Sequence, residues 1–206
     1  KDTPEKPIVV CSLGDGTTQQ GEFLEALQEA SRESAPVLFV VEDNGWAIST
    51  KTRGRTPLWL GARDGNSLLG VGIQKLNGRE IHSCLPAFTK LVHQMRSDRK
   101  PQIVWMDVDR LHSHTNADDH RTYRTSDEIE RAAREGDPVR NLENHLWREG
   151  VSAETLASIR EQARSTVEAA ADEAQFGGEP IAMLDAKKVL PKELTNPASE
   201  KEAKGN

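Results

Sequence analysis

The sequence has 206 residues, of which 35% are hydrophobic and 29% are charged, and its formal net charge is −6. This length and composition predict a soluble globular chain with one core and a solvated periphery. The acidic balance and the lack of a dense Lys/Arg run argue against a nucleic-acid partner or an anionic membrane surface. The apolar runs fall well short of the roughly 20 residues that span a bilayer. We therefore expect neither nucleic acid nor membrane as a partner.

The first residues read KDTPEKPIVV, without an initiator Met or the apolar core of a signal peptide. We interpret the chain as a piece of something longer. Its two cysteines are Cys11, in a strand predicted to be buried, and Cys84, near a predicted helix start. Because they form neither a CxxC motif nor a disulfide pattern, we expect a reduced, cytoplasmic location.

Apolar runs typical of β-strands alternate with amphipathic helical patterns in the first half of the chain. Runs at 8–13, 37–41 and 101–108 predict strands, and patterns over 21–34 and 85–97 predict helices. Apolar strands separated by helices are typical of βαβ units. The sequence therefore predicts an α/β fold, a mostly parallel sheet with helices on both faces. The helix residues expected to face the core are Phe23, Leu24, Leu27, Ala30, Phe88, Leu91, Val92 and Met95.

The chain changes character after the last predicted strand. Residues 111–125 are polar and irregular and predict a loop, which we assign to a first domain over 1–125. A helical segment follows over 126–190, and the polar residues 191–206 predict a flexible tail or linker.

Three helix starts can be recognised in this C-terminal part. Thr125 and Glu128 have the spacing of a capping box, Asp137 precedes a proline, and Ser152 precedes a long amphipathic pattern. We expect the apolar stripe of the last helix to pack against something. Its members are Leu156, Ile159, Ala163, Val167 and Ala170.

The motif Gly14-Asp15-Gly16 lies between the first predicted strand and the first predicted helix. Such a layout aims backbone N–H groups at a phosphate, but the Asp15 carboxylate would repel one. Asn44 follows the next strand, and neighbouring parallel strands bring their carboxyl ends together. A carboxylate beside an amide oxygen suits Mg²⁺ or Ca²⁺. We therefore expect a cation joining Asp15 to a diphosphate, whose other oxygens meet the N–H groups after Gly16 at the helix start.

Simpler interpretations of these residues stay open. A lone GDG is common in surface turns, and Asp-Asn before Gly is a turn signal first. The loop histidines and aspartates resemble a metal site, with ordinary solvated side chains as the competing interpretation. These loop residues are His112, His114, Asp118, Asp119 and His120. We expect Trp59, Trp105 and Trp147 to be packing residues, and assign no function to His82, His93 and His145.

Further motifs carry a family resemblance. The GDG motif is followed by Gly21, Glu25-Ala26, Ala30 and the segment DNGWAIS at 43–49. Downstream lie RLHSHT at 110–115, Asp118-Asp119 and YRT at 123–125. In this combination the chain resembles the α subunit of the thiamine diphosphate-dependent, decarboxylating first component of 2-oxo acid dehydrogenase complexes. The resemblance runs from residue 8 to about residue 191.

The resemblance implies a thiamine diphosphate-binding fold and a role for each matching residue. Asp15 and Asn44 would be side-chain ligands of Mg²⁺, and Trp46 would add its backbone carbonyl. Arg110 would offer its planar guanidinium to the phosphates. His114 would stand near the thiazolium carbon as the catalytic residue, because a histidine can give or take a proton near neutral pH. The other implied cofactor-binding residues are Gly14, Gly16, Thr17 and Ile48.

The implied reaction is oxidative decarboxylation of a 2-oxo acid with acyl transfer to a lipoyl acyltransferase. The cofactor performs the hard step and the protein orients it. In the family a β subunit, or a β half of the same enzyme, completes an α₂β₂-type assembly and supplies the glutamate that activates the aminopyrimidine. This chain alone is therefore not expected to turn over. The NGWAIST segment and Asp118-Asp119 favour a branched-chain substrate, with pyruvate next.

The chain also departs from the family pattern. Asp43 stands where relatives usually have Asn, which adds negative charge beside the proposed ion, and Trp46 replaces the usual Tyr. Residues 51–72 fit poorly, and a long section that precedes the GDG strand in relatives is missing here. Two other functions stay open: another thiamine diphosphate enzyme, such as transketolase or acetoin dehydrogenase, and a truncated, non-catalytic assembly module.

Overall fold

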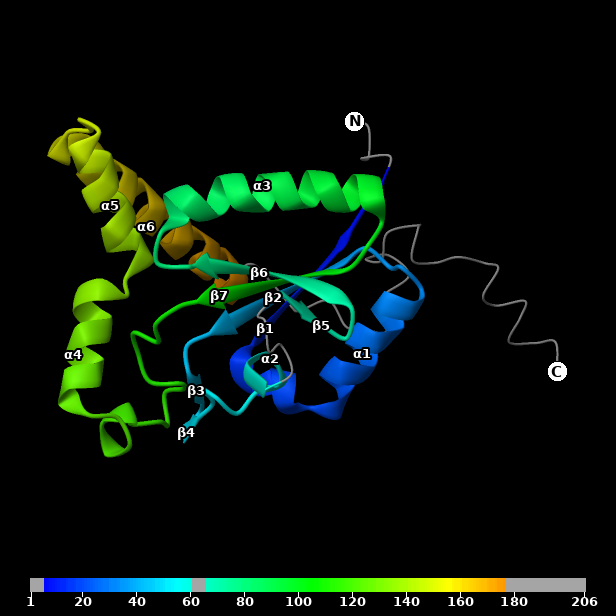
Figure 1. The fold of residues 1–206 in the computed structure, drawn as a ribbon. Helices are drawn as coiled ribbons and strands as arrows, with labels where there is room; N and C mark the ends of the chain where they lie inside the picture. Colours follow the sequence, from blue (N-terminus) through cyan, green and yellow to red (C-terminus); the bar gives the residue numbers. More distant parts are fainter. Residues whose placement is uncertain (1–5, 61–65, 177–206) are drawn as a thin grey trace. The chain divides into compact units, whose positions relative to one another are not determined.

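Five strands form one sheet in the order β1-β2-β7-β6-β5, as the ribbon in Figure 1 shows. The first four run parallel, and β5 runs antiparallel to β6. A separate antiparallel pair, β3 and β4, follows β2. The computed structural model describes residues 6–60 and 66–176. The strands are β1 (Val9–Gly14), β2 (Val37–Asp43), β3 (Trp46–Ala47), β4 (Thr50–Lys51), β5 (Ser67–Leu68), β6 (Val71–Asn77) and β7 (Gln102–Asp107).

Helices follow most of the strands along the chain. In order they are η1 (Asp15–Gln19), α1 (Gly21–Arg32), α2 (Pro57–Leu60), α3 (Ile81–Asp98), η2 (His120–Thr122), α4 (Ser126–Glu135), α5 (Pro138–Arg148) and α6 (Ala153–Phe176). The two η elements are short 3₁₀ helices.

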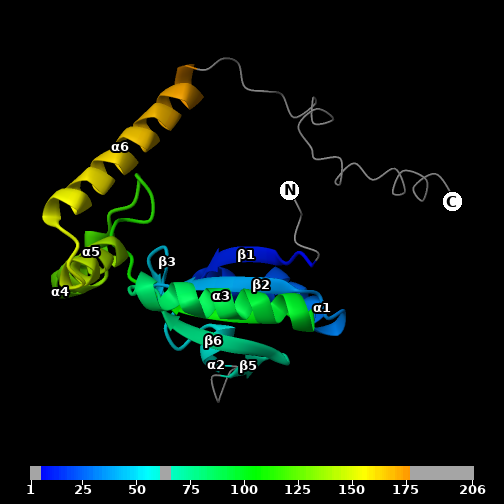
Figure 2. The same cartoon turned by 90° about the horizontal axis from the view of Figure 1, so that it is seen from above.

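The core lies on both faces of the sheet, because successive β2 side chains alternate between the faces. Phe39 packs with Leu27 of α1, whereas Leu38 packs with Leu91 of α3. Figures 1 and 2 accordingly place α1 and α3 on opposite sides of the strands. The predicted α/β class with a mostly parallel sheet is confirmed. The eight helix residues predicted to face the core are all buried or partly buried against it.

The prediction of a buried first strand is wrong. β1 is an edge strand, and β2 is its one neighbour among the described elements. Val9 and Val10 are therefore 60% and 59% exposed, and Cys11 is exposed as well. The apolar run correctly indicated a strand, but it could not indicate what covers that strand.

Strand β6 was not predicted from the sequence, and helix α3 starts earlier than predicted. The β6 residues, VGIQKLN, show neither a continuous apolar run nor a strict alternation of apolar and polar side chains. Helix α3 begins at Ile81 rather than at residue 85, which places Pro86 inside it. Pro86 cannot donate to the carbonyl of His82, but its fixed φ fits the early turns of a helix.

The three predicted helix starts are confirmed by their caps. Thr125 and Glu128 form the reciprocal capping box of α4. The Asp137 carboxylate accepts from the second and third residues of α5, at 2.9 and 3.3 Å. The Ser152 hydroxyl accepts from the Thr155 N–H at 3.2 Å at the start of α6. Such caps satisfy N–H groups that the helix itself leaves unpaired.

The described chain divides into two units, with the boundary between Val151 and Ser152. The first unit contains the sheet together with α4 and α5. In the second, α6 has no buried residue among those described, and what its apolar stripe packs against stays a prediction. The domain boundaries predicted after residues 125 and 190 stay predictions, and the predicted tail lies outside the described residues. Over 6–60 and 66–176, no helix combines the length and the apolar character needed to cross a membrane.

Candidate functional site

The carboxyl ends of β1 and β2 lie side by side at one edge of the sheet. Their parallel register pairs Gly14 with Glu42, so Asp15 leaves β1 next to the position where Asp43 ends β2. The polar residues that follow both strands therefore share this edge, as expected for open parallel sheets. We call this region the strand-end cluster and define it by Asp15, Gly16, Asn44, Gly45 and Thr52.

Asp15 is a buried carboxylate, only 2% exposed. One carboxylate oxygen accepts a close hydrogen bond from the hydroxyl of Thr52. Burial raises the pKa of Asp15; the Thr52 hydrogen bond opposes that rise, and the negative charge of Asp43 adds to it. Among the described residues no Lys or Arg forms an ion pair with Asp15. Within that part of the chain, Asp15 is therefore a buried carboxyl group that lacks a positive partner.

Gly16 lies in close contact with the hairpin that follows β2. A Cβ built on Gly16 would approach the Cβ of Ala47 to 2.5 Å, so this position requires glycine. The helix predicted from residue 21 is confirmed as α1, which starts at Gly21, but residues 15–19 before it form a separate 3₁₀ helix, η1. The hydroxyl of Thr18 donates to the carbonyl of Asp15 at 2.6 Å, a local side-chain bond to the backbone of η1. The N–H groups after Gly16 therefore belong to η1.

Asn44 and its neighbours form a tight turn between β2 and β3. The Asn44 Oδ1 accepts from the N–H of Trp46 at 3.0 Å, and Gly45 adopts φ +78, which favours glycine. The N–H of Thr52 donates to the carbonyl of Gly45 at 3.1 Å. Thr52 therefore bonds both to Asp15 and to the Asn44 turn, which brings the two predicted strand ends together. Nothing in the sequence singled out Thr52.

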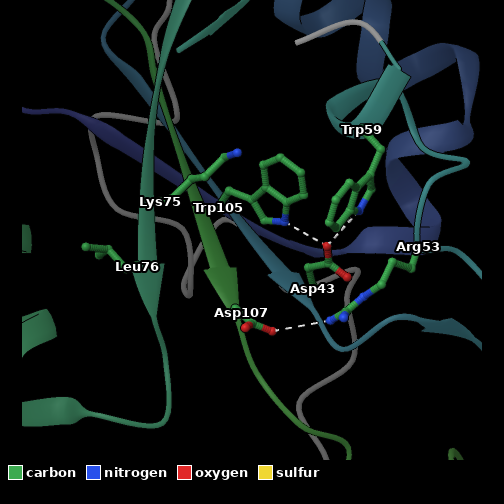
Figure 3. Close-up of a pocket in the computed structure, with 7 residues that line it drawn as sticks. All are labelled: Asp43, Arg53, Trp59, Lys75, Leu76, Trp105 and Asp107. Atoms are coloured by element: carbon green, nitrogen blue, oxygen red, sulfur yellow. Dashed lines mark hydrogen bonds and ion pairs between the residues drawn. The ribbon is translucent and has the colours of Figure 1, made fainter. Parts of the chain in front are cut away.

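Asp43 lines a pocket of about 230 Å³, where its carboxylate lies beside Trp105 and Trp59 (Figure 3). Its carboxylate accepts from the N–H of Gly45 at 2.9 Å and from the indoles of Trp105 and Trp59 at 2.7 and 3.2 Å. The charge of Asp43 does act on Asp15, as expected, but its oxygens are already engaged. Trp59 and Trp105 are thus hydrogen-bond donors and not only packing residues. Trp147 is 66% exposed, so its predicted packing role is wrong.

Arg110 comes to the same hairpin from the end of β7. One Nη donates to the carbonyl of Ile48 at 2.7 Å and the other to the hydroxyl of Tyr123 at 2.8 Å. The guanidinium also lies 5.9 Å from the centre of the Trp46 ring. Its Nε is buried and has no hydrogen-bond partner in the described part of the chain. The Nε atoms of Arg96 and Arg124 are in the same state, and such a donor can form a hydrogen bond only if an acceptor is added.

The 111–125 loop is organised by Asp118. This carboxylate accepts from the backbone N–H of His114 at 2.8 Å and from the hydroxyl of Tyr123 at 2.6 Å. The Tyr123 hydrogen bond is the main reason that the pKa of Asp118 lies below its usual value. Since Tyr123 also accepts from Arg110, which donates to Ile48, the loop is connected to the β3–β4 hairpin. The side chain of His114 is exposed.

An ion-pair network holds the chain between the end of β7 and this loop. Asp109 pairs closely with Arg79 and lies 3.1 Å from Arg131 of α4. Burial would raise the pKa of Asp109, but the two arginines outweigh it and lower the pKa. Sequence reasoning missed this network, because its members lie far apart along the chain.

The donor groups of the strand-end cluster fit a hard cation. Within 6–60 and 66–176 no three His, Cys, Asp or Glu side chains gather as a metal site, and this includes the loop histidines. An ion at Asp15 would therefore need amide, backbone, phosphate and water oxygens, which suit Mg²⁺ better than a transition metal. A divalent ion would also supply the positive partner that the buried Asp15 lacks. The predicted metal residues Asp15, Asn44 and Trp46 stay a prediction.

Comparison with known proteins gives a consistent result. A family model described as "Dehydrogenase E1 component" matches residues 1–182. The pyruvate dehydrogenase E1 component subunit alpha of Zymomonas mobilis is 30% identical over 163 residues, covering 79% of this chain and 46% of that protein. The 3-methyl-2-oxobutanoate dehydrogenase subunit alpha of Mycobacterium tuberculosis is 29% identical, covering 74% of this chain and 41% of that protein.

A plant relative extends the range of named substrates. The mitochondrial 2-oxoisovalerate dehydrogenase subunit alpha 1 of Arabidopsis thaliana is 26% identical, covering 78% of this chain and 35% of that protein. The chain thus spans less than half the length of these relatives. Since the family model covers most of the chain, the protein belongs to the dehydrogenase E1 component family.

Proposed function

We propose that this chain supplies the metal- and diphosphate-binding half of a thiamine diphosphate site. The observation that carries the proposal is Asp15, a buried carboxylate with no cationic partner among the described residues, joined through Thr52 to the Asn44 turn. Burying an unpaired charge is costly, so the arrangement makes physical sense when a cation binds there.

Each residue has a role in the proposed site. Asp15, Asn44 and the carbonyl of Trp46 hold Mg²⁺, while Gly14, Gly16 and Thr17 lie against the diphosphate. Gly16 packs closely against Ala47, which leaves no space for a side chain at Gly16 and holds the η1 backbone against the β3–β4 hairpin. The list of proposed contacts is completed by Ile48, Arg110 and His114.

Arg110 is the proposed anion-binding residue. Its buried, unpaired Nε supports the assignment, since a phosphate oxygen would provide the missing acceptor. The hydrogen bonds to Ile48 and Tyr123 fix the guanidinium before any ligand arrives. Orientation in advance lowers the entropic cost of binding.

The proposed reaction is the oxidative decarboxylation of a 2-oxo acid, with transfer of the acyl group to a lipoyl acyltransferase. Thiamine diphosphate supplies the electron-accepting carbon centre when bound. His114 holds or delivers a proton near that centre, and Asp118 fixes the backbone that carries it. A branched-chain 2-oxo acid is the proposed substrate, with pyruvate next; the names of the relatives include both classes. The cytoplasm stays the predicted compartment.

A β subunit, or a β half of the same enzyme, is the proposed partner that completes the site. The experiment uses that assembly and measures thiamine diphosphate binding by calorimetry with and without Mg²⁺. Asp15→Ala should abolish the Mg²⁺-dependent binding, and the exposed Asp172→Ala should leave it unchanged. Equal affinity in wild type and Asp15→Ala would remove Asp15 from the site. A decarboxylation screen against branched-chain 2-oxo acids, pyruvate and 2-oxoglutarate then tests the substrate.

A further inference from the structure

We propose that Trp105 and Trp59 are positioning residues for the proposed metal site and that they act through the carboxylate of Asp43. This inference rests on the proposed function for the use of the Asn44 turn. We call this arrangement the clamp. Its acceptor is the Asp43 carboxylate, and its donors are the backbone N–H of Gly45 and the indole N–H groups of Trp59 and Trp105.

Three N–H groups surround the Asp43 carboxylate, which is only 4% exposed. One oxygen accepts from the N–H of Gly45 at 2.9 Å, and the other from Trp105 at 2.7 Å and Trp59 at 3.2 Å. A buried carboxylate needs such donors in place of water. The orientation of Asp43 therefore depends on where the two indoles stand.

The donors come from separate parts of the fold (Figure 3). Trp105 lies in the neighbouring strand β7, and Trp59 lies in the short helix α2. Their rings meet edge to face, with centroids 5.0 Å apart and an interplanar angle of 88°. The clamp thus connects the end of β2 to two elements that are not adjacent to it in the chain.

The carboxylate passes this constraint to the metal-binding turn. Its bond to the N–H of Gly45 fixes the residue whose φ is +78, and the adjacent Asn44 Oδ1 is in turn held by the N–H of Trp46. On the opposite side, Thr52 holds the carbonyl of Gly45. The direction of the Asn44 amide and of the Trp46 carbonyl is therefore set from both sides.

Packing alone does not account for Trp59. Its ring is 40% exposed and borders the pocket, yet its N–H donates inward to Asp43. Trp105 is buried, so its packing and its hydrogen bond must be separated by experiment. Replacing tryptophan with phenylalanine removes the N–H donor and keeps an aromatic ring.

The first experiment compares Trp→Phe variants in the full-length protein assembled with its β partner. Mg²⁺ affinity is measured by titration at saturating thiamine diphosphate. Trp105→Phe should weaken Mg²⁺ binding by about tenfold, which is the effect of about 1.4 kcal/mol. Trp59→Phe should weaken it severalfold, because its hydrogen bond is longer. The control Trp147→Phe, in an exposed part of α5, should bind as the wild type does.

A second experiment tests the direction of the hydrogen bonds. The side-chain amide of Asp43→Asn can take two orientations. In one, its NH₂ group faces the indole N–H groups of Trp105 and Trp59; in the other, it faces the N–H of Gly45 and that hydrogen bond is lost. The double variant Asp43→Asn with Trp105→Phe removes the strongest donor conflict. Mg²⁺ affinity should recover partly relative to Asp43→Asn alone, and strictly additive losses would contradict the clamp.

Hydrogen exchange separates the two proposals. The amide of Gly45 should exchange faster in Trp105→Phe than in Trp147→Phe, whether or not a cofactor binds. Faster exchange in a protein that binds no Mg²⁺ or thiamine diphosphate would support the clamp and reject the proposed function. Exchange and Mg²⁺ affinity equal to the control would overturn the clamp. Circular dichroism checks that each variant is folded, and Trp59→Phe provides the milder change if Trp105→Phe is not.

Discussion

The strand-end cluster and the 111–125 loop use carboxylates in opposite ways. In the cluster, Asp15 is buried, has Thr52 as its side-chain donor, and has its pKa raised by burial. In the loop, Asp118 lies at the surface, accepts from Tyr123 and the His114 N–H, and has its pKa lowered by those bonds. The surroundings of Asp15 disfavour its charged form, so a cation would stabilise it. The hydrogen bonds of Asp118 favour its charged form and hold the loop backbone in place.

The largest expected effect comes from filling the space beside Gly16. Gly16→Ala brings its new methyl group against the Ala47 Cβ, and such overpacking costs about 1–3 kcal/mol of folding free energy. Denaturant unfolding measures this cost. Ala47→Gly in the same protein removes the opposing methyl group and should restore much of the stability. Failure of this double variant to recover would show that the η1 backbone, and not the methyl contact, limits the site.

Thr52→Val removes the hydroxyl donor from buried Asp15 while keeping the side-chain shape. Loss of a hydrogen bond to a buried charged group should destabilise the protein by about 1.5 kcal/mol at neutral pH. Thr122→Val is the matched control in the loop, since its exposed hydroxyl donates to a backbone carbonyl at 2.8 Å. Thermal unfolding should show little change for that control. Equal losses in both variants would mean that burial does not distinguish the two regions.

The loop has its own pH dependence, which follows from the lowered pKa of Asp118. A lowered folded-state pKa contributes order that is present above the usual value of 3.8 and is lost as pH falls below it. Limited proteolysis of residues 111–125 should therefore accelerate on acidification. Asp118→Asn should already be cut faster at pH 7, because the carboxylate that holds His114 and Tyr123 is gone. Protection of the loop that is unchanged in this variant would contradict the role of Asp118.

The smallest expected effect concerns the surface pair between the hairpin and α4. Lys51 and Glu128 lie 3.1 Å apart, and the Lys51 side chain is 61% exposed. Lys51→Met should cost less than about 1 kcal/mol, and less still at high salt. Chemical denaturation at two salt concentrations measures this. A larger loss would mean that the pair couples the strand-end cluster to the helical part.

Local sequence patterns predicted the parts of the fold that depend on neighbours along the chain. The α1 face with Phe23 and Leu27 followed from helical spacing, and the Thr125–Glu128 capping box from two residues and their separation. The meeting of Asp15 with the Asn44 turn was also predictable, because parallel strands with one connecting helix share an edge.

Features that depend on partners far apart along the chain could not be predicted from the sequence. Thr52 and the two indoles on Asp43 are defined by contacts between separate elements. Strand β6 has no continuous apolar run, and its position is set by β7. The exposure of Cys11 depends on what lies beside β1, and the residues of β1 themselves do not indicate this.

The edge position of β1 has a practical consequence for anyone who prepares this chain by itself. Val9 and Val10 are exposed, and within residues 6–60 and 66–176 one backbone edge of β1 pairs with no strand, so this edge is a template for adding a further strand. Self-association through this edge would compete with folding of the single chain, so the chain is best prepared at low concentration.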